Sequence, residues 1–261
     1  MGMDKQVKAT AADGAQTPDH VVIEEPLQIV VDGHPVAVTM RTPGHDAELA
    51  LGFLLTEGVI HSVGDVRKID VESRANHALV FLADGVEVDF ERLTRHVFSA
   101  SSCGLCGKAT IEAVTSCRAA VPDGPVFSRA VLLASPEKLA AAQTVFSRTG
   151  GLHGVGLFGV DGTAQVVRED VGRHNAVDKA LGYAMRAGLD LSGCFLLVSG
   201  RVSFEIMQKA LAGGVPLVAA ISAPSSLAVE FAEQSNQTLV GFLRPPTFRV
   251  YAGAARISGL A

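Results

Sequence analysis

Residues 194–221, CFLLVSGRVSFEIMQKALAGGVPLVAAI, contain two short apolar runs on either side of a helix-forming segment. The runs Phe195 to Ser199 and Leu217 to Ile221 are continuous rather than alternating, which is typical of strands that are covered on both faces. The segment Phe204 to Ala212 between them is predicted to be a helix. This order of strand, helix and strand predicts a parallel pair joined by a crossover helix.

Further strands and helices surround this stretch over residues 135–261. A hairpin is predicted from Gly154–Val160 and Ala164–Arg168. A helix is predicted from Ser135-Pro136, where serine is the N-cap and proline takes the first helical position, to Gly150-Gly151. The other predicted elements are helices over Asn175–Arg186 and Ser226–Gln234 and a strand over Leu239–Leu243. The sequence therefore predicts an α/β fold in which residues 135–261 form a three-layer α/β/α body.

The N-terminal part of the chain has a different pattern. Residues 1–19 are polar and rich in small side chains, and we predict that they form a disordered tail. Residues 20–134 are predicted to form a smaller, β-rich lobe that also holds the cysteine-bearing loop. The elements predicted in this lobe are strands at Val21–Ile23, Leu27–Val31, Val36–Met40, Val66–Val71 and Ala78–Leu82 and a helix over Asp46–Glu57.

The composition excludes several classes of protein. Of the 261 residues, 48% are hydrophobic and 19% are charged, which is sufficient for a sizeable core. The net charge of −5 argues against a protein that mainly coats nucleic acid or an anionic membrane. No apolar run reaches the roughly 18 residues of a spanning helix, and no segment of signal-peptide type opens the chain. We therefore expect a cytoplasmic protein that binds neither nucleic acid nor membranes.

Cys103 and Cys106 lie in the glycine-rich segment Ser101–Lys108, which reads SSCGLCGK. The neighbouring glycines remove side-chain bulk, so both thiols can turn toward one incoming atom. Lys108 and the start of a helix predicted to follow provide a positive potential, which lowers the pKa of a nearby thiol. We therefore expect reactive thiolates at neutral pH.

Other roles for this cysteine pair fit the sequence less well. A structural zinc site needs four ligands, and Cys117 and Cys194 are predicted to be core residues, so no metal site is expected. A thioredoxin-like pair would directly follow the first strand of a βαβ unit, and a zinc deaminase would carry a His-x-Glu or Cys-x-Glu element. The remaining interpretation is a nucleophilic thiolate that carries a group between partners.

Polar turns follow the predicted strands at the edge where an open α/β sheet binds its ligands. Ser199, Gly200 and Arg201 precede a helix N-terminus, where main-chain N–H groups bind anions. The densest cluster supplies the candidates Arg168, Asp170, Arg173, His174, Asn175 and Lys179. Such a set suits a phosphate with an attached base. A solvated helix face with a salt-bridged cap explains the same residues equally well.

Two further candidates come from glycine-rich or proline-rich turns. The segment Phe242-Leu243-Arg244-Pro245-Pro246-Thr247 places an arginine and an aromatic ring beside a rigid turn, so it is either a purine clamp or an ordinary turn. His153 lies between glycines and is either a proton-transfer group or a turn residue.

Several of these motifs, taken together and in order, resemble those of the formate dehydrogenase accessory sulfurtransferases, the FdhD family. The resemblance runs from about Val21 to Tyr251 and depends on the combination, since a Cys-x-x-Cys motif alone is weak evidence. The matching motifs are Ser102–Gly107, Gly150–His153, Glu169–Lys179, Ser199–Arg201 and Ser222–Ser225.

The resemblance implies a cytidine-deaminase-like fold without the deaminase zinc, and a homodimer. It also implies a sulfur carrier that takes persulfide sulfur from a cysteine desulfurase and transfers it to the bis-molybdopterin guanine dinucleotide cofactor of formate dehydrogenase. Because this cofactor ends in guanosine phosphates, GDP is expected to act as a partial mimic. The alternative is a cofactor-binding chaperone whose cysteines carry no sulfur.

The resemblance also assigns roles to particular residues. Cys103 is implied to carry the persulfide, with Cys106 as its partner, and residues 242–247 are implied to contact the cofactor. Pro245 and Pro246 depart from the family pattern and lack the main-chain N–H donor, which puts those two contacts in doubt.

Overall fold

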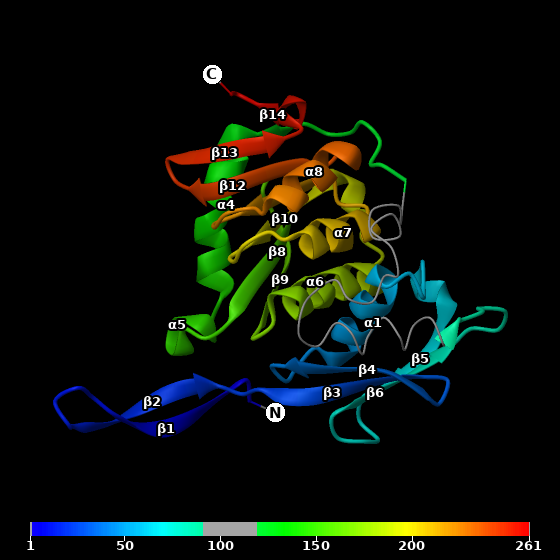
Figure 1. The fold of residues 1–261 in the computed structure, drawn as a ribbon, viewed down its shortest axis with the longest axis vertical. Helices are drawn as coiled ribbons and strands as arrows, with labels where there is room; N and C mark the ends of the chain where they lie inside the picture. Colours follow the sequence, from blue (N-terminus) through cyan, green and yellow to red (C-terminus); the bar gives the residue numbers. More distant parts are fainter. Residues whose placement is uncertain (1, 91–118, 261) are drawn as a thin grey trace.

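The computed structural model describes residues 2–90 and 119–260, and its centre is a six-stranded mixed sheet with the strand order β13-β12-β11-β10-β8-β9 (Figure 1). Strands β10, β11 and β12 are parallel to one another, while β8, β9 and β13 are antiparallel to their neighbours. The strands are β8 (His153–Gly159), β9 (Ala164–Asp170), β10 (Cys194–Val198), β11 (Leu217–Ala220), β12 (Thr238–Arg244) and β13 (Thr247–Ala252).

Helices cover both faces of this sheet. Alternate residues of β10 point to opposite faces: Leu197 packs with Leu132 of α4, whereas Leu196 belongs to the core that α6, α7 and α8 share. The helices are α4 (Arg129–Ala142), α6 (Arg173–Ala187), α7 (Phe204–Ala212) and α8 (Ser226–Gln234), with the short α5 (Phe146–Thr149) after α4. The predicted α/β class and its three layers are thus confirmed.

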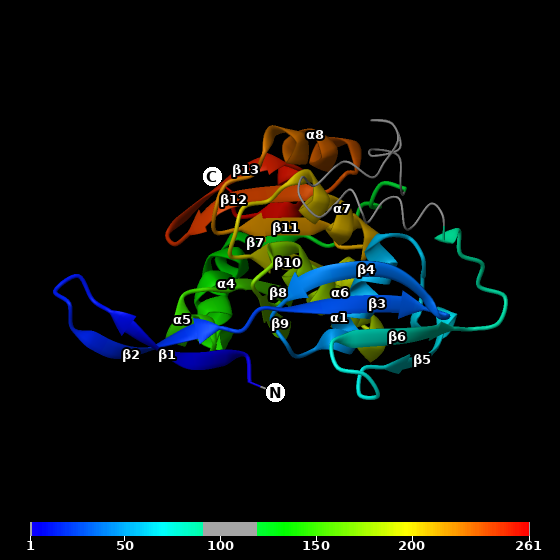
Figure 2. The same ribbon diagram turned by 60° about the horizontal axis from the view of Figure 1, so that its bottom comes forward.

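A second sheet with the strand order β4-β3-β6-β5 lies on the side of α6, with α1 packed between this sheet and α6 (Figure 2). Its elements are β3 (Glu25–Val31), β4 (His34–Arg41), β5 (Val66–Asp70), β6 (His77–Leu82) and α1 (Asp46–Thr56). A Cβ added to Gly52 of α1 would overlap the main chain of Asp178, and one added to Gly182 of α6 would overlap that of Glu48. Both helices therefore touch through their backbones, so the core continues from the central sheet into the N-terminal one.

The N-terminal segment differs from the prediction of a disordered tail over residues 1–19. Strands β1 (Asp4–Thr10) and β2 (Gln16–Val22) form an antiparallel hairpin that projects from the body in both views (Figures 1 and 2). The guanidinium of Arg148 in α5 donates to both carboxylate oxygens of Asp4, at 3.2 and 2.9 Å. Composition did not indicate this hairpin because ion pairs and backbone bonds, rather than an apolar face, hold it in place.

Helix α4 also begins earlier than predicted, so the expected boundary between residues 134 and 135 falls inside a helix. The N-cap is Ser128, whose hydroxyl accepts a hydrogen bond from the Val131 N–H at 3.1 Å. Pro136 lies within the helix, where it cannot donate to the carbonyl of Leu132. The hydroxyl of Ser135 donates to that carbonyl instead, at 2.8 Å, so the helix continues through the proline.

Short elements complete the described chain: a parallel pair β7 (Phe127–Ser128) and β14 (Ile257–Ser258), and the 3-10 helices η1 (Val63–Asp65), η2 (Leu191–Gly193) and η3 (Ala254–Arg256). Within residues 2–90 and 119–260, no helix has both the length and the apolar character that crossing a membrane requires. The predicted cysteine loop and the helix predicted after it lie outside the described residues.

Candidate anion-binding site at the carboxyl edge of the central sheet

The predicted polar turns meet at one edge of the central sheet, which we call the carboxyl edge because β10, β11 and β12 all end there. The antiparallel strand β8 begins at this edge with His153, and β9 ends there with Asp170. Ser199, just after β10, donates its main-chain N–H to the Gly154 carbonyl and accepts the Gly154 N–H on its hydroxyl, both at 2.9 Å. The turns after the strands are therefore held in fixed positions.

Two helices start at the carboxyl edge without a side-chain cap. The N-cap of α6 is Gly172, which has no side chain to accept a hydrogen bond, and the hydroxyl of Ser203, the N-cap of α7, accepts none from the first turn. Helix α8 differs, since the hydroxyl of Ser225 accepts the Ala228 N–H at 3.3 Å. The two uncapped ends lie side by side, because Nε2 of His174 lies 3.4 Å from the Ser203 hydroxyl. Free N–H groups at adjacent helix starts favour an anion.

Arginine and histidine side chains gather around these two helix starts. Arg173 is half-buried, and its Nε atom is buried without a hydrogen-bond partner among the described residues. Arg201 is exposed on the turn after β10, and a Cβ added to Gly200 would lie 3.2 Å from Nδ1 of His153. Glu205 is the carboxylate nearest to His174, with 3.9 Å between its Oε2 and Nε2. The site thus carries more positive than negative charge.

The titration of the two histidines reflects this positive potential. Burial and the nearby Arg173 and Arg201 guanidinium groups lower the pKa of His153, although Asp170 acts in the opposite direction. Burial, Lys209 and Arg173 lower the pKa of His174 to about 4 against the opposing effect of Glu205. Both imidazoles are therefore neutral at pH 7 and keep one nitrogen able to accept a proton or hydrogen bond.

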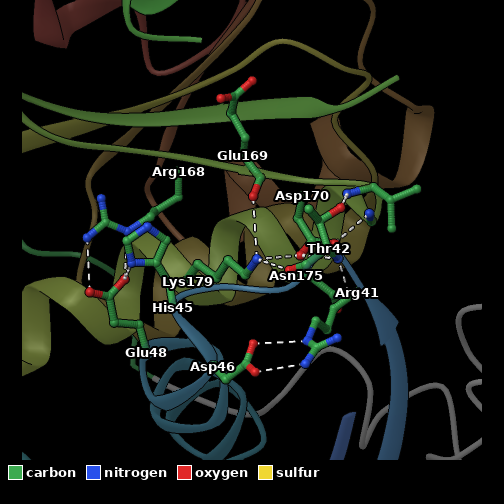
Figure 3. Close-up of polar contacts among 12 residues, drawn as sticks. Arg41, Thr42, His45, Asp46, Glu48, Arg168, Glu169, Asp170, Asn175 and Lys179 are labelled. Atoms are coloured by element: carbon green, nitrogen blue, oxygen red, sulfur yellow. Dashed lines mark hydrogen bonds and ion pairs between the residues drawn. The ribbon is translucent and has the colours of Figure 1, made fainter. Parts of the chain in front are cut away.

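Lys179 and Asp170, which the sequence placed among the ligand-binding candidates, form a buried ion pair instead (Figure 3). Nζ of Lys179 lies 2.7 Å from Asp170 Oδ2 and donates to the Thr42 carbonyl at 2.8 Å. Neither side chain has exposed surface. Asn175 belongs to the same network, since its Nδ2 donates to the Met40 carbonyl and to Asp170. The charge of Lys179 is neutralised inside the protein, which goes against its predicted contact with a phosphate.

Arg168 also has a partner within the fold. Its Nε and Nη2 donate to the two carboxylate oxygens of Glu48 in α1, at 2.6 and 2.9 Å, and its guanidinium lies 4.8 Å from the ring centre of Tyr183 (Figure 3). Although burial alone raises the pKa of Glu48, hydrogen bonds and charges from His45 and Arg168 bring it down to about 2. This pair joins β9 to α1, so it contributes to the packing of the lobes rather than to the carboxyl edge.

The turn between β12 and β13 lies at the same edge as the site, and it carries the C-terminal candidates. The main-chain N–H of Phe242 donates to the Ser222 carbonyl at 3.0 Å, and Nε of Arg244 donates to the Ile221 carbonyl at 3.0 Å. Leu243 is fully buried in the core on the α4 face, so its side chain has no route to a ligand. Pro245, Pro246 and Thr247 are exposed, and the Pro245–Pro246 peptide bond is cis.

The partners of Arg168 and Lys179 within the fold are not apparent from the sequence. Glu48 and Thr42 come from the N-terminal lobe, more than a hundred positions away in the chain, as the separations of 120 and 137 residues show. No local motif marks such partners. Cys103 and Cys106 lie outside the described residues, and among the residues that are described no group of histidine, cysteine, aspartate and glutamate side chains is arranged to hold a metal ion.

Comparisons with known proteins agree with the resemblance seen in the sequence. The model of the FdhD/NarQ family matches residues 22–258. A protein of Streptomyces avermitilis named sulfur carrier protein FdhD is 51% identical over 260 residues, covering 94% of this chain and 92% of its own length. A protein of the same name from Mycobacterium tuberculosis is 48% identical over an alignment of 269 positions, which covers 97% of this chain and 98% of the other.

A solved structure is similar along almost the whole chain. The crystal structure of a putative formate dehydrogenase accessory protein from Desulfotalea psychrophila has a TM-score of 0.82 at 25% sequence identity, covering 98% of this chain and 100% of the other. The family match spans both sheets and every element of the carboxyl edge. The chain therefore belongs to the FdhD/NarQ family.

Proposed function

We propose that this protein is a sulfur carrier that receives persulfide sulfur from a cysteine desulfurase and transfers it to the bis-molybdopterin guanine dinucleotide cofactor of formate dehydrogenase. Two lines of support come from the comparisons: the curated relatives are named sulfur carrier proteins, and the similar crystal structure is described as a formate dehydrogenase accessory protein. The desulfurase, the dehydrogenase client and the family's homodimeric state are parts of this proposal.

One structural observation supports the binding of a phosphate-containing ligand above all others: the Nε of Arg173 is buried without a hydrogen-bond partner in the described part of the chain, beside two uncapped helix starts. The buried Nε of Arg173 needs an acceptor, and the first turns of α6 and α7 offer main-chain donors next to it. Phosphate oxygens satisfy both kinds of donor, and guanidinium groups bind them in a fork geometry. The residues at the carboxyl edge thus fit the phosphates of a guanine dinucleotide.

The structure narrows the residues that we propose for this ligand. Arg173 and Arg201 remain as phosphate partners, with His153, His174, Ser199 and Gly200 around them. Arg168, Asp170, Asn175 and Lys179 are taken up by contacts within the fold. On the C-terminal turn, we propose that Phe242, Arg244 and Thr247 contact the ligand by their side chains and the two prolines only by their carbonyls or rings.

The sulfur-carrying step is assigned to Cys103 in this proposal. Its thiolate attacks the terminal sulfur of the donor persulfide, the S–S bond of the donor breaks, and the donor cysteine leaves as a thiolate. Cys103 then holds the sulfur as its own persulfide until the bound cofactor receives it. Neutral histidines at the carboxyl edge are suited to hold or release a proton during the transfer.

Two measurements test the proposal. After incubation with a cysteine desulfurase and labelled cysteine, mass spectrometry is expected to find a persulfide on the wild-type protein and none on Cys103→Ala; if the variant gains the same mass, another cysteine is the carrier. Calorimetric titration with GDP is expected to give a micromolar or tighter dissociation constant. Binding of GDP without any labelled persulfide would favour the alternative of a cofactor-binding chaperone, and absence of both would overturn the proposed function.

A further inference from the structure

The side chain of Asn175, in the first turn of α6, connects three parts of the chain. Its Nδ2 donates to the Met40 carbonyl at 2.8 Å and to Asp170 Oδ1 at 3.2 Å, while its Oδ1 accepts the Thr39 hydroxyl at 3.1 Å. Both N–H groups of the amide and one lone pair of its oxygen are used. This set of partners fixes the orientation of the amide, since a flipped amide would turn its oxygen toward the Met40 carbonyl and the Asp170 carboxylate, which are both acceptors.

Two partners of Asn175, Thr39 and Met40, lie on β4, which is an edge strand of the N-terminal sheet, and the third, Asp170, ends β9. Just beyond β4, the Thr42 N–H donates to Asp170 Oδ2 at 3.2 Å, and the Thr42 hydroxyl accepts the Val171 N–H at 3.2 Å. Figure 3 shows that this segment runs alongside the end of β9 and the start of α6. Residues 39–42 of the N-terminal lobe therefore hold the segment that leads into α6.

Asp170 is the centre of this joint. Its two carboxylate oxygens accept hydrogen bonds or an ion pair from the main-chain N–H groups of Thr42 and Gly172 and from the side chains of Asn175 and Lys179, at distances of 3.2, 2.8, 3.2 and 2.7 Å. The carboxylate has no exposed surface. Because each of its oxygens already accepts from two donors, the carboxylate fixes the positions of those donors, and its charge also raises the pKa of His153.

We propose that Asn175 is a positioning residue: by bridging β4 to Asp170, it holds the first turn of α6 so that Arg173 and His174 face the carboxyl edge. This inference takes its ligand, a guanine nucleotide, from the proposed function. The hydrogen bonds of Asn175 are present without that ligand. Arg173, His174 and Asn175 share one helical turn, so an anchor on the third fixes the other two. Nucleotide affinity then depends on contact between the N-terminal lobe and α6.

A purely structural role for Asn175 would lower stability without changing the carboxyl edge, so the test needs a readout at that edge. His174 provides it, since burial is the largest cause of its low pKa. If the first turn of α6 loosens, His174 gains solvent and its pKa rises toward 6.5, the usual value of an exposed histidine. The proton resonances of the imidazole report this pKa directly, and a His174→Gln spectrum assigns them.

The variants are Asn175→Ala, Thr39→Val and Thr39→Ser, with Ser235→Ala as the control. Ser235 is a buried serine whose hydroxyl donates to the Phe231 carbonyl, at the end of α8 and away from the carboxyl edge. We expect Asn175→Ala and Thr39→Val to weaken GDP binding about tenfold and to raise the pKa of His174 by about one unit. Thr39→Ser, which keeps the hydroxyl, and Ser235→Ala should retain the wild-type values of both.

Each outcome decides the proposal. If Asn175→Ala and Thr39→Val lose stability but keep the wild-type GDP affinity and His174 titration, Asn175 is not a positioning residue. If Asn175→Ala does not fold, Thr39→Val alone carries the comparison, because it removes a single hydrogen bond. If wild-type protein does not bind GDP, the proposed nucleotide site fails, and the His174 titration still decides whether Asn175 holds the first turn of α6.

Discussion

The ammonium of Lys179 lies 2.7 Å from the carboxylate of Asp170, and neither side chain has exposed surface. Replacing Lys179 by methionine leaves a buried carboxylate with no cation beside it. We expect Lys179→Met to lower the free energy of unfolding by about 3–5 kcal/mol, measured by urea denaturation at pH 7. The double variant Lys179→Met/Asp170→Asn should lose less than the single variant, because no buried charge remains. A single-variant loss below about 1 kcal/mol would contradict the buried pairing.

Helices α1 and α6 meet through Gly52 and Gly182, and this contact leaves no room for a side chain. A Cβ on Gly182 would overlap the carbonyl of Glu48, so Gly182→Ala must push the two helices apart. We expect it to cost about 3 kcal/mol or more of unfolding free energy. The matched control is Gly193→Ala, since a Cβ there meets nothing within 4 Å and should change stability by less than about 0.5 kcal/mol. Equal effects of the two substitutions would be inconsistent with the helix contact described.

Arg173 and Arg201 are expected to contribute to ligand binding without contributing much to stability. Removing one charge-assisted donor from a phosphate should cost about 1.5–3 kcal/mol, so Arg173→Ala or Arg201→Ala should weaken GDP binding roughly 10- to 100-fold. Arg148→Ala is the control, because Arg148 pairs with Asp4 near the N-terminal hairpin. Calorimetry with the three variants makes the comparison. Unchanged affinity in both carboxyl-edge variants would remove these arginines from the site.

Ligand binding is also expected to depend on pH through His153 and His174. Their pKa values are lowered in the free protein, that of His174 to about 4, and a bound phosphate raises them by its negative charge. A group whose pKa rises on binding takes up protons, so affinity for GDP should increase as the pH falls from 8 toward 5. Titrations in buffers with different ionisation heats measure the proton uptake. His174→Gln should reduce the uptake, while any change in the protonation of the GDP phosphate is common to both proteins.

Local patterns predicted those elements whose signals lie close together in the sequence. Helices α7 and α8 have the predicted bounds, because a serine N-cap and an apolar stripe mark each of them. Helix α4 was predicted to start too late, since Pro136 is typical of a first turn and the compensating Ser135 hydroxyl is visible only in three dimensions.

The sequence indicated where polar residues gather in the fold, but not which of them have partners within the protein. The sequence indicated correctly that polar turns gather at the ends of the strands, because strand order and helix starts are local features. The sequence alone does not distinguish Arg173, whose Nε has no partner in the described chain, from Lys179, which is paired with Asp170. Both are basic side chains within two turns of α6. Burial distinguishes them, and it depends on Thr42 from the N-terminal lobe and on Asp170 at the end of β9. The sequence around a charged residue does not indicate whether its side chain binds a ligand or another residue of the protein.

The two cysteines of the loop are expected to have different roles in sulfur transfer. Cys106 is closer to Lys108 in the sequence, so its thiolate should be the more stabilised, while Cys103, which follows Ser101 and Ser102, should be easier for a bulky donor to reach. We therefore expect Cys106→Ala to load sulfur on Cys103 and to hold it longer than wild type, because no second thiol attacks the persulfide to release sulfide. The same variant should activate formate dehydrogenase poorly. The lifetime of the labelled persulfide in wild type and Cys106→Ala, measured together with client activity, tests this assignment. If loading is lost in Cys106→Ala and kept in Cys103→Ala, the roles of the two cysteines are reversed.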